Sequence, residues 1–119
     1  MKLKELVKSH EVLKKLANQE MPIRVSFKIG VFLKEAEKYL QSYEEERMKL
    51  FEMYGEEKSE GELVVPEEHR SDFLQKMSEL GEESIDIKCP ELDLDNLVDV
   101  KLSPQDIVLI DFLFEGDKE

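Results

Sequence analysis

Residues 22–55 of the chain read PIRVSFKIGVFLKEAEKYLQSYEEERMKLFEMYG, and a single apolar period runs through them. It opens with Pro22, which suits the first turn of a helix because proline lacks an N–H group and fixes its own φ angle. It closes with Gly55, a residue type that often ends helices in the left-handed conformation. Between them, apolar residues recur at alternating spacings of four and three, which predicts one helix over residues 23–54. Its seam comprises Val25, Ile29, Phe32, Ala36, Tyr39, Tyr43, Glu46, Leu50 and Met53.

A shorter amphipathic helix is predicted over residues 2–19, so that the two helices form a hairpin with unequal arms. At a rise of about 1.5 Å per residue, the first arm is roughly 27 Å long and the second roughly 48 Å. The first arm then covers the second only to about residue 38. We expect the rest of the seam to pack both against the C-terminal half and against a second copy of the chain. The expected oligomer interface comprises Tyr39, Tyr43, Glu46, Leu50, Met53 and Tyr54.

The C-terminal half begins with a polar segment, residues 56–61, which we expect to be a surface loop. A helix is predicted over residues 66–81, because proline and acidic residues open it and a glycine ends it. A short apolar helix is predicted over residues 104–114, with Ser103 as its N-cap. The tail, residues 115–119, is expected to be frayed.

Two segments have the pattern of strands. Residues 62–65 are a short candidate, and residues 84–89 alternate with period two, as a half-buried strand does. Residues 92–102 alternate loosely and are expected to be extended. The fold class is therefore mainly α (α+β), a long unequal helical hairpin followed by a short β ribbon and two short helices. We expect one domain over residues 1–119, in which the acidic part, 56–119, packs on the hairpin of residues 1–55.

Charge is unevenly divided along the chain. The 119 residues hold 17 Lys and Arg against 29 Asp and Glu, a formal net charge of −12. Residues 1–54 carry a net charge of +2 and residues 55–119 a net charge of −14, while residues 1–28 alone carry +4. Such asymmetry can steer partners or support head-to-tail self-association. A solvated surface with uneven charge is an equally good explanation.

Composition also limits the class of protein. The length fits one domain. No run approaches the roughly 18 apolar residues that a membrane-spanning helix needs, and the amphipathic start is unlike a signal peptide. Cys89, the sole cysteine, has no partner for an internal disulfide, which fits a reducing compartment. We therefore expect a cytoplasmic protein that does not bind membranes.

Residues suited to catalysis or metal binding are few. The histidines are His10 and His69, and together with Cys89 they do not have the spacing of a zinc site. No nucleophile, base and orienting group follow a recognisable pattern. The five glycines are scattered singly, unlike a phosphate-binding loop. We expect no catalytic residue, metal or cofactor, and keep a small enzyme as the least favoured alternative.

Two polar residues interrupt the apolar seams. His10 is either a pH-sensitive group at the seam or a boundary histidine with one hydrogen-bond partner, which we favour. Glu46 either specifies the register and oligomeric state or marks where the seam turns to solvent. Asp93, Asp95 and Asp99 offer oxygen ligands for calcium, but the glycine and distal glutamate of an EF-hand are missing, so a solvated acidic edge is favoured.

Basic residues near the start of the long helix are the best candidates for binding. Arg24 and Lys28 are four residues apart and share a helical face, beside Ser26. Across the hairpin we expect three lysines to lie near them, so that the set can grip a phosphate-bearing ligand or an acidic partner. The alternative is a mixed surface in which the long cationic side chains cover the seam. The three lysines are Lys8, Lys14 and Lys15. Duplex nucleic acid is disfavoured as a partner because the chain has a net negative charge.

Several segments resemble a family of small proteins from tailed phages and prophages whose function is unknown. The resemblance rests on Met21–Ile29, Phe32–Lys34, Glu44–Leu50, Tyr54–Glu56 and Leu102–Asp106. It implies a phage setting, a protein of the host cytoplasm or the virion, and no catalytic residue. We therefore expect a non-enzymatic accessory protein that binds a host factor or a host-derived ligand, most plausibly to block a bacterial defence system. The alternative is a component of the virion or of tail assembly.

Overall fold

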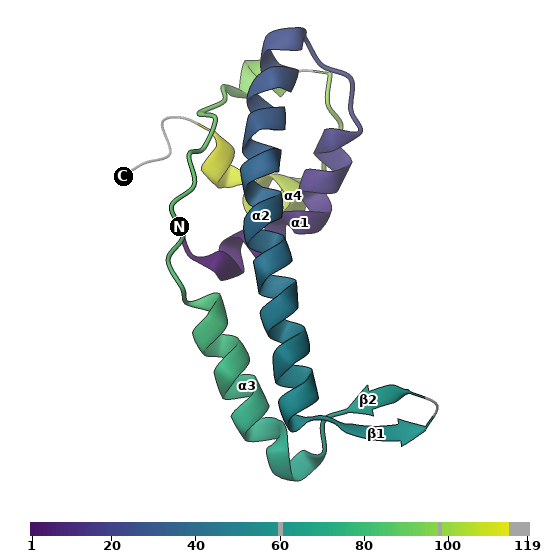
Figure 1. Ribbon diagram of the computed structural model, residues 1–119. Coiled ribbons are helices and arrows are strands. Elements are labelled where there is room, and N and C mark those ends of the chain that lie inside the picture. The colour runs from purple at the N-terminus through teal and green to yellow at the C-terminus, as the bar shows by residue number, and fades with distance from the viewer. Residues whose placement is uncertain (60, 98, 115–119) are drawn as a thin grey trace.

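The computed structural model describes residues 1–59, 61–97 and 99–114. Its longest element is helix α2, Ile23–Tyr54, and helix α1, Leu3–Ala17, packs against the first half of α2 (Figure 1). The predicted helical hairpin with unequal arms is thus confirmed. Pro22 precedes α2 as predicted, and the N–H of Gly55 donates to the Phe51 carbonyl at 2.7 Å at its end.

Gly55 ends α2 for a different reason from the one predicted. Its φ of −86° is not left-handed, so the backbone angles alone do not require glycine there. A Cβ at this position would instead overlap the carbonyl oxygen of Phe51, one turn earlier in the helix. Glycine is therefore needed for space at this helix end.

The core lies where the first half of α2 meets α1 and the C-terminal segment. Val25, Ile29, Phe32 and Ala36, the first four seam residues, are all buried. Residues 92–97 and 99–114 return to this region and complete the same apolar cluster. The largest fully buried apolar side chains are Phe32, Leu6, Leu13, Leu16, Leu92, Ile110 and Leu113.

The second half of α2, which α1 does not reach, packs against helix α3, Glu67–Gly81 (Figure 1). The ring of Phe73 lies 5.0 Å from that of Phe51 and 6.5 Å from that of Tyr54, measured between centroids. These α2 residues follow the predicted seam positions by one residue. A straight helix has 3.6 residues per turn, so a heptad seam drifts by about 20° per repeat. Met53, which the heptad places on the seam, is accordingly 70% exposed.

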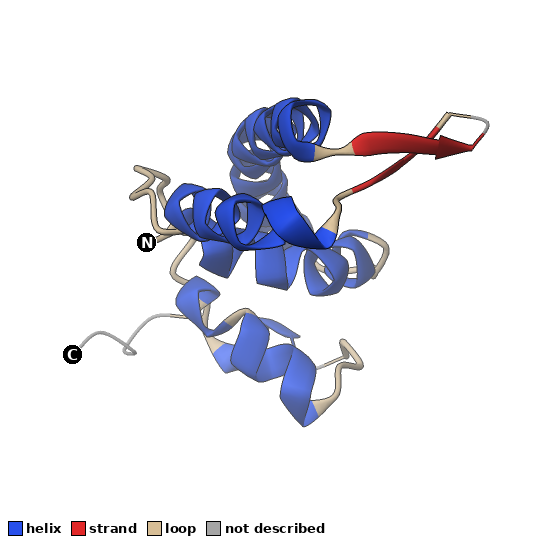
Figure 2. Ribbon diagram, turned by 90° about the horizontal axis from the view of Figure 1, so that it is seen from below, coloured by secondary structure: helices blue, strands red, loops and turns tan. Residues whose placement is uncertain are grey.

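The β ribbon consists of strands β1, Glu56–Ser59, and β2, Glu62–Val64. The strands are antiparallel and stand out from the helices at the end of α2 (Figure 1, Figure 2). The prediction of a loop over residues 56–61 is therefore wrong for β1. The residues of β1 are polar and do not have a strand pattern, and they form a strand because β2 pairs with them.

The predicted strand over residues 84–89 does not form. Ser84 makes one isolated bridge with Lys2, and the rest of the segment is irregular. Ile85 and Ile87 are nevertheless half-buried and pack against the core. The alternation therefore reflects burial on one side of an extended chain rather than pairing with a strand.

Between residues 92 and 114 the structure differs from the prediction at two places. Residues expected to be extended form a short 3₁₀ helix, η1, Leu94–Leu97. Helix α4, Pro104–Leu109, begins at Ser103 as predicted, with the Ser103 hydroxyl accepting a hydrogen bond from the Asp106 N–H. It ends before residue 114 and is followed by a second 3₁₀ turn, η2, Asp111–Leu113. The prediction for residues 115–119 lies outside the described residues.

Candidate functional site: a groove beside the start of α2

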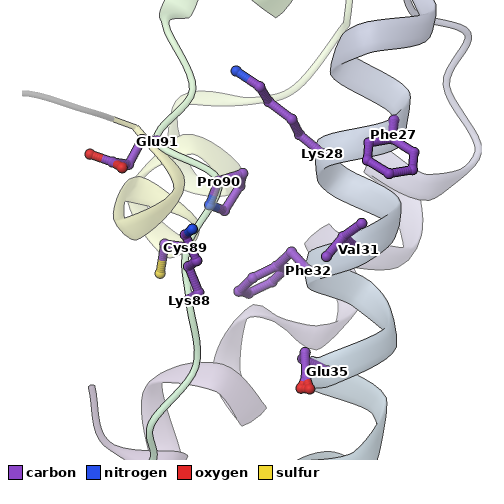
Figure 3. Close-up of a pocket in the computed structure, with 9 residues that line it drawn as sticks. All are labelled: Phe27, Lys28, Val31, Phe32, Glu35, Lys88, Cys89, Pro90 and Glu91. Carbon is purple, nitrogen blue, oxygen red and sulfur yellow. The ribbon is translucent and has the colours of Figure 1, made fainter.

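A groove of about 380 Å³ runs between the first half of α2 and the extended segment 88–91. Phe27, Val31 and Phe32 line the helical wall, with the Phe32 ring directed across the groove towards the opposite segment (Figure 3). Phe32 is 1% exposed and forms the floor, whereas Phe27 is 72% exposed at the rim. The volume lies within the range of pockets that hold small ligands or a few side chains of a partner.

An exposed apolar stripe continues from the groove along α2. Ile23, Phe27 and Val31 are spaced four residues apart, so they share one face of the helix, which differs from the buried face. Their exposed fractions are 83%, 72% and 49%. Single exposed apolar residues are ordinary on protein surfaces, but a contiguous apolar stripe beside a groove is typical of a contact surface.

The opposite wall is held in place from below. The Leu92 N–H donates to the Leu113 carbonyl at 2.5 Å, and Leu92 also bridges to Phe114. Leu92 itself is fully buried, so it anchors the chain next to the groove. Glu91 has a φ of 54°, a left-handed conformation that few residue types other than glycine adopt at low energy. The segment that forms this wall is therefore anchored to the core directly after Glu91.

Charge is distributed along the groove in a simple way. Residues 21–34 carry three cationic side chains, Arg24, Lys28 and Lys34, and no acidic one. Figure 3 shows Lys28 and Glu35 at opposite ends of the helical wall. Lys88 and Glu91 add one charge of each sign on the other wall. On the helical wall the positive charge therefore lies towards the start of α2, and Figure 3 places Glu91 opposite it on the other wall.

The other predicted binding residues do not line the groove. Ser26 directs its hydroxyl to the Met21 carbonyl at 3.5 Å and is exposed on α2. Lys8 lines a separate cavity between α1, α2 and α3. Lys14 pairs with Glu11 on its own helix at 3.7 Å, and Lys15 pairs with Asp106 at 3.0 Å. Of the six predicted binding residues, the structure places Lys28 in the groove wall and Arg24 one turn before it on the same helix.

The predicted oligomer interface is partly covered within the chain. The Tyr39 hydroxyl donates to the Asp86 carbonyl at 3.0 Å, and Tyr54 contacts the rings of Phe73 and His69. Met53 stays largely exposed. Tyr43 and Leu50 are half-buried, while Glu46 is exposed and pairs with Lys49 at 3.1 Å.

Ion pairs join both ends of α1 to the C-terminal half of the chain. Lys2 and Lys4, at the start of α1, both bind Glu82 just after α3, and these bonds lower the pKa of Glu82 to about 2. The Lys15 ammonium, together with the backbone N–H of Ser103, lowers the pKa of Asp106. Each pair ties α1 to a later element of the chain.

His10 is half-buried at the boundary between α1 and α2, and the hydrogen-bond partner expected for it stays a prediction. It lines a cavity of about 90 Å³ together with Leu13 of α1 and Leu33 and Leu40 of α2. The acidic turn at 93–96 is held by local hydrogen bonds, in which Asp93 Oδ1 accepts from the Asp95 N–H at 3.1 Å. Both features are accounted for by packing and turn formation.

A second constellation was not found from the sequence. Glu56 of β1 and Glu68 and His69 of α3 place their ligand atoms within 4.8 Å of one another. The sequence offered no sign of it beyond the neighbours Glu68 and His69, because Glu56 reaches them only after the ribbon folds back.

No family model matches the chain, and no curated protein or solved structure matches it either. In the part of the chain that the structure describes, none of the helices combines the length and the apolar character needed to cross a membrane.

Proposed function

We propose that the protein is a non-enzymatic binding protein, and that its groove receives an acidic amphipathic helix from a partner protein. The observation that carries this proposal is the exposed stripe of Ile23, Phe27 and Val31 beside the groove. A helix-in-groove contact of this kind is anchored by apolar residues spaced three and four apart on the incoming helix.

The dimensions and charge of the surface favour such an occupant. Ile23 and Val31 are eight residues apart on α2, so the stripe is about 12 Å long, or roughly two helical turns. Arg24, Lys28 and Lys34 lie along the same half of α2, and Glu35, the acidic residue of this wall, lies at the other end of the groove from Lys28. Carboxylates flanking the apolar anchors of the partner would meet these cations, which gives both orientation and a faster encounter.

The resemblance to phage and prophage proteins favours a bacterial host protein as the partner. Inhibition of a host defence factor is then the purpose we propose, acting in the host cytoplasm and by one-to-one binding. If a phosphate-bearing ligand binds at Arg24 and Lys28 instead, the function would be the sequestration of a small molecule. A role in the virion or in tail assembly predicts instead that the protein is present in purified particles.

Site-specific photo-crosslinking in bacterial cells tests the groove. A crosslinking amino acid at position 27 should capture a partner segment, identified by mass spectrometry, that is acidic and amphipathic. The same amino acid at position 108 is the control, since Val108 is similarly exposed, at 64%, on α4. Equal capture of one protein from both positions, or of no protein from position 27, would refute the proposal.

A synthetic peptide of the captured segment then measures affinity by fluorescence anisotropy. Phe27→Glu should weaken binding at least tenfold, because it places a charge on the apolar stripe and repels an acidic partner. Val108→Glu should leave binding unchanged. A thermal-shift screen with nucleotides and inorganic phosphate reports the small-molecule alternative.

We further propose that the chain associates with a second copy through the part of α2 that α3 leaves uncovered. Met48 and Met53 are 43% and 70% exposed there, on the half of the chain where Glu46 also faces solvent. Light scattering at micromolar concentration should detect the oligomer, and Met53→Glu should dissociate it. A strict monomer would refute this part of the proposal.

A further inference from the structure

Three metal-binding side chains converge where α2, the ribbon and α3 meet. Glu56 begins β1, and Glu68 and His69 lie in the first turn of α3. One oxygen of each carboxylate and one imidazole nitrogen all lie within 4.8 Å of one another. This cluster, Glu56–Glu68–His69, combines carboxylate oxygens with an imidazole nitrogen. It joins the first residue of the ribbon to the helix that follows the ribbon.

The local fold explains why these residues meet. β1 starts directly after Gly55, and its first residue, Glu56, pairs with Val64 of β2. The chain leaves β2 at Val64 and enters α3 at residue 67, so the first turn of α3 lies beside the start of β1. The ring of Tyr54 lies 6.3 Å from the ring of His69, centroid to centroid, so the end of α2 also lies beside the cluster.

The electrostatics of the cluster favour the binding of a cation. Two carboxylates this close repel each other when both are ionised. Within residues 1–59, 61–97 and 99–114, neither Glu56 nor Glu68 forms an ion pair with a lysine or arginine whose side chain is described. The surrounding half of the chain carries a net charge of −14. A bound cation would convert this repulsion into attraction.

We propose that Glu56, Glu68 and His69 bind a divalent transition-metal ion, with Zn²⁺ the best fit. Imidazole nitrogen with carboxylate oxygen is a donor set that Zn²⁺ accepts, whereas Mg²⁺ and Ca²⁺ take oxygen ligands. Around Zn²⁺ with bonds of about 2.1 Å, tetrahedral ligand atoms are about 3.4 Å apart, so small rotations of exposed side chains complete the site. The fourth position is open to water or to a group from a partner.

Metal binding would link the ribbon to the helices. An isolated two-stranded hairpin is marginally stable in water, and all three residues of β2 are exposed. A metal held by Glu56 on β1 and by two residues of α3 would fix the base of the ribbon. Because the ion would bind the folded chain, it would raise the free energy of unfolding by an amount that grows with the logarithm of the ion concentration divided by its Kd.

Isothermal titration calorimetry of the full chain with ZnCl₂ tests the site. One ion should bind per chain, and both His69→Asn and Glu68→Gln should lower the affinity at least tenfold. The chain supplies matched controls in His10, the other histidine, and in Glu67, the neighbour of Glu68. His10→Asn and Glu67→Gln should retain the affinity of the original chain. Glu56→Gln provides a third ligand variant on a different element.

A second measurement separates a site from general attraction to an acidic surface. Zn²⁺ should raise the melting temperature of the original chain, followed by circular dichroism, and should not raise that of His69→Asn. Circular dichroism without metal establishes that each variant folds. Absence of Zn²⁺ binding, equal loss in His10→Asn and His69→Asn, or Mg²⁺ binding with the same affinity as Zn²⁺ would each overturn the proposal.

Discussion

Phe27 and Phe32 provide a direct test of the distinction between the core face and the contact face of α2. They lie five residues apart and line the same groove, yet Phe27 is 72% exposed and Phe32 is 1% exposed. The structure therefore predicts a small change in stability when Phe27 is replaced by alanine and a large loss when Phe32 is replaced. Phe32 serves folding, and Phe27 serves the proposed contact.

The two magnitudes follow from burial. Truncation of a buried phenylalanine to alanine costs about 3–5 kcal/mol, and Phe32 would also lose its contact with the Phe112 ring, 5.9 Å away. Phe27 has about a quarter of its surface buried. With about 1.5–3 kcal/mol for full burial of such a side chain, truncation at position 27 removes about 0.4–0.8 kcal/mol. The higher helix propensity of alanine offsets up to about 0.7 kcal/mol of this loss.

Urea unfolding followed by far-UV circular dichroism measures both variants. Phe27→Ala should change the free energy of unfolding by no more than about 0.8 kcal/mol, and Phe32→Ala should lower it by about 3–5 kcal/mol. A loss of stability above about 2 kcal/mol for Phe27→Ala would contradict the exposure of Phe27, because a side chain this exposed cannot contribute so much to the free energy of unfolding. Repeating the measurement at several protein concentrations shows whether a second copy covers Phe27, since stability then depends on concentration.

Three further variants test individual features of the fold. Ser103→Ala should lower the free energy of unfolding by about 1 kcal/mol, because it removes the N-cap of α4, as urea unfolding would show. Gly55→Ala should cost about 1–3 kcal/mol, because the new Cβ must displace the end of α2, and a neutral result would contradict the close approach seen there. Glu82, whose folded-state pKa is lowered from 4.5 to about 2, contributes stability that is present above pH 4.5 and is lost as the pH falls towards 2. Urea unfolding across that range should show a weaker pH dependence for Glu82→Gln, with Lys2 and Lys4 left without their acceptor.

The helices could be predicted from the sequence because their evidence is local. The seam of α2 has a period that only a helix satisfies, and Pro22, Gly55 and Ser103 mark boundaries within one or two residues. The predicted ends agree closely with the observed α1, α2 and α3. What the heptad could not show is the small drift of a straight helix, which turned Met53 towards solvent.

The extended segments could not be predicted in the same way, because a strand is defined by its partner. β1 has four polar residues and pairs with β2, while the alternating residues 84–89 have almost no partner. Side-chain alternation reports burial on one side, and the hydrogen bonds of a ladder depend on which segment lies beside it.

The groove was only half accessible to sequence reasoning. Arg24 and Lys28 were recognised as a shared cationic face, but the apolar stripe beside them was missed. Ile23, Phe27 and Val31 fit the general apolar character of α2, and their exposure became evident only when α1 and the core occupied the opposite face. The other wall, at 88–91, comes from about 60 residues further along the chain, so no local pattern could place it there.

The groove and the Glu56–Glu68–His69 cluster lie at opposite ends of α2. Because of this separation, we expect binding at one site to leave the affinity of the other unchanged. Phe27 and Tyr54 are 27 residues apart on one helix, which corresponds to about 40 Å. Sites so distant that share no contacts act additively within about 0.5 kcal/mol, so Zn²⁺ should leave the affinity of the groove for an acidic peptide unchanged in a monomer. Head-to-tail association would change this, because it brings the acidic end of one copy to the basic end of another. Coupling between Zn²⁺ and peptide binding that grows with protein concentration would therefore identify that arrangement, whereas coupling independent of concentration would contradict the separation of the two sites.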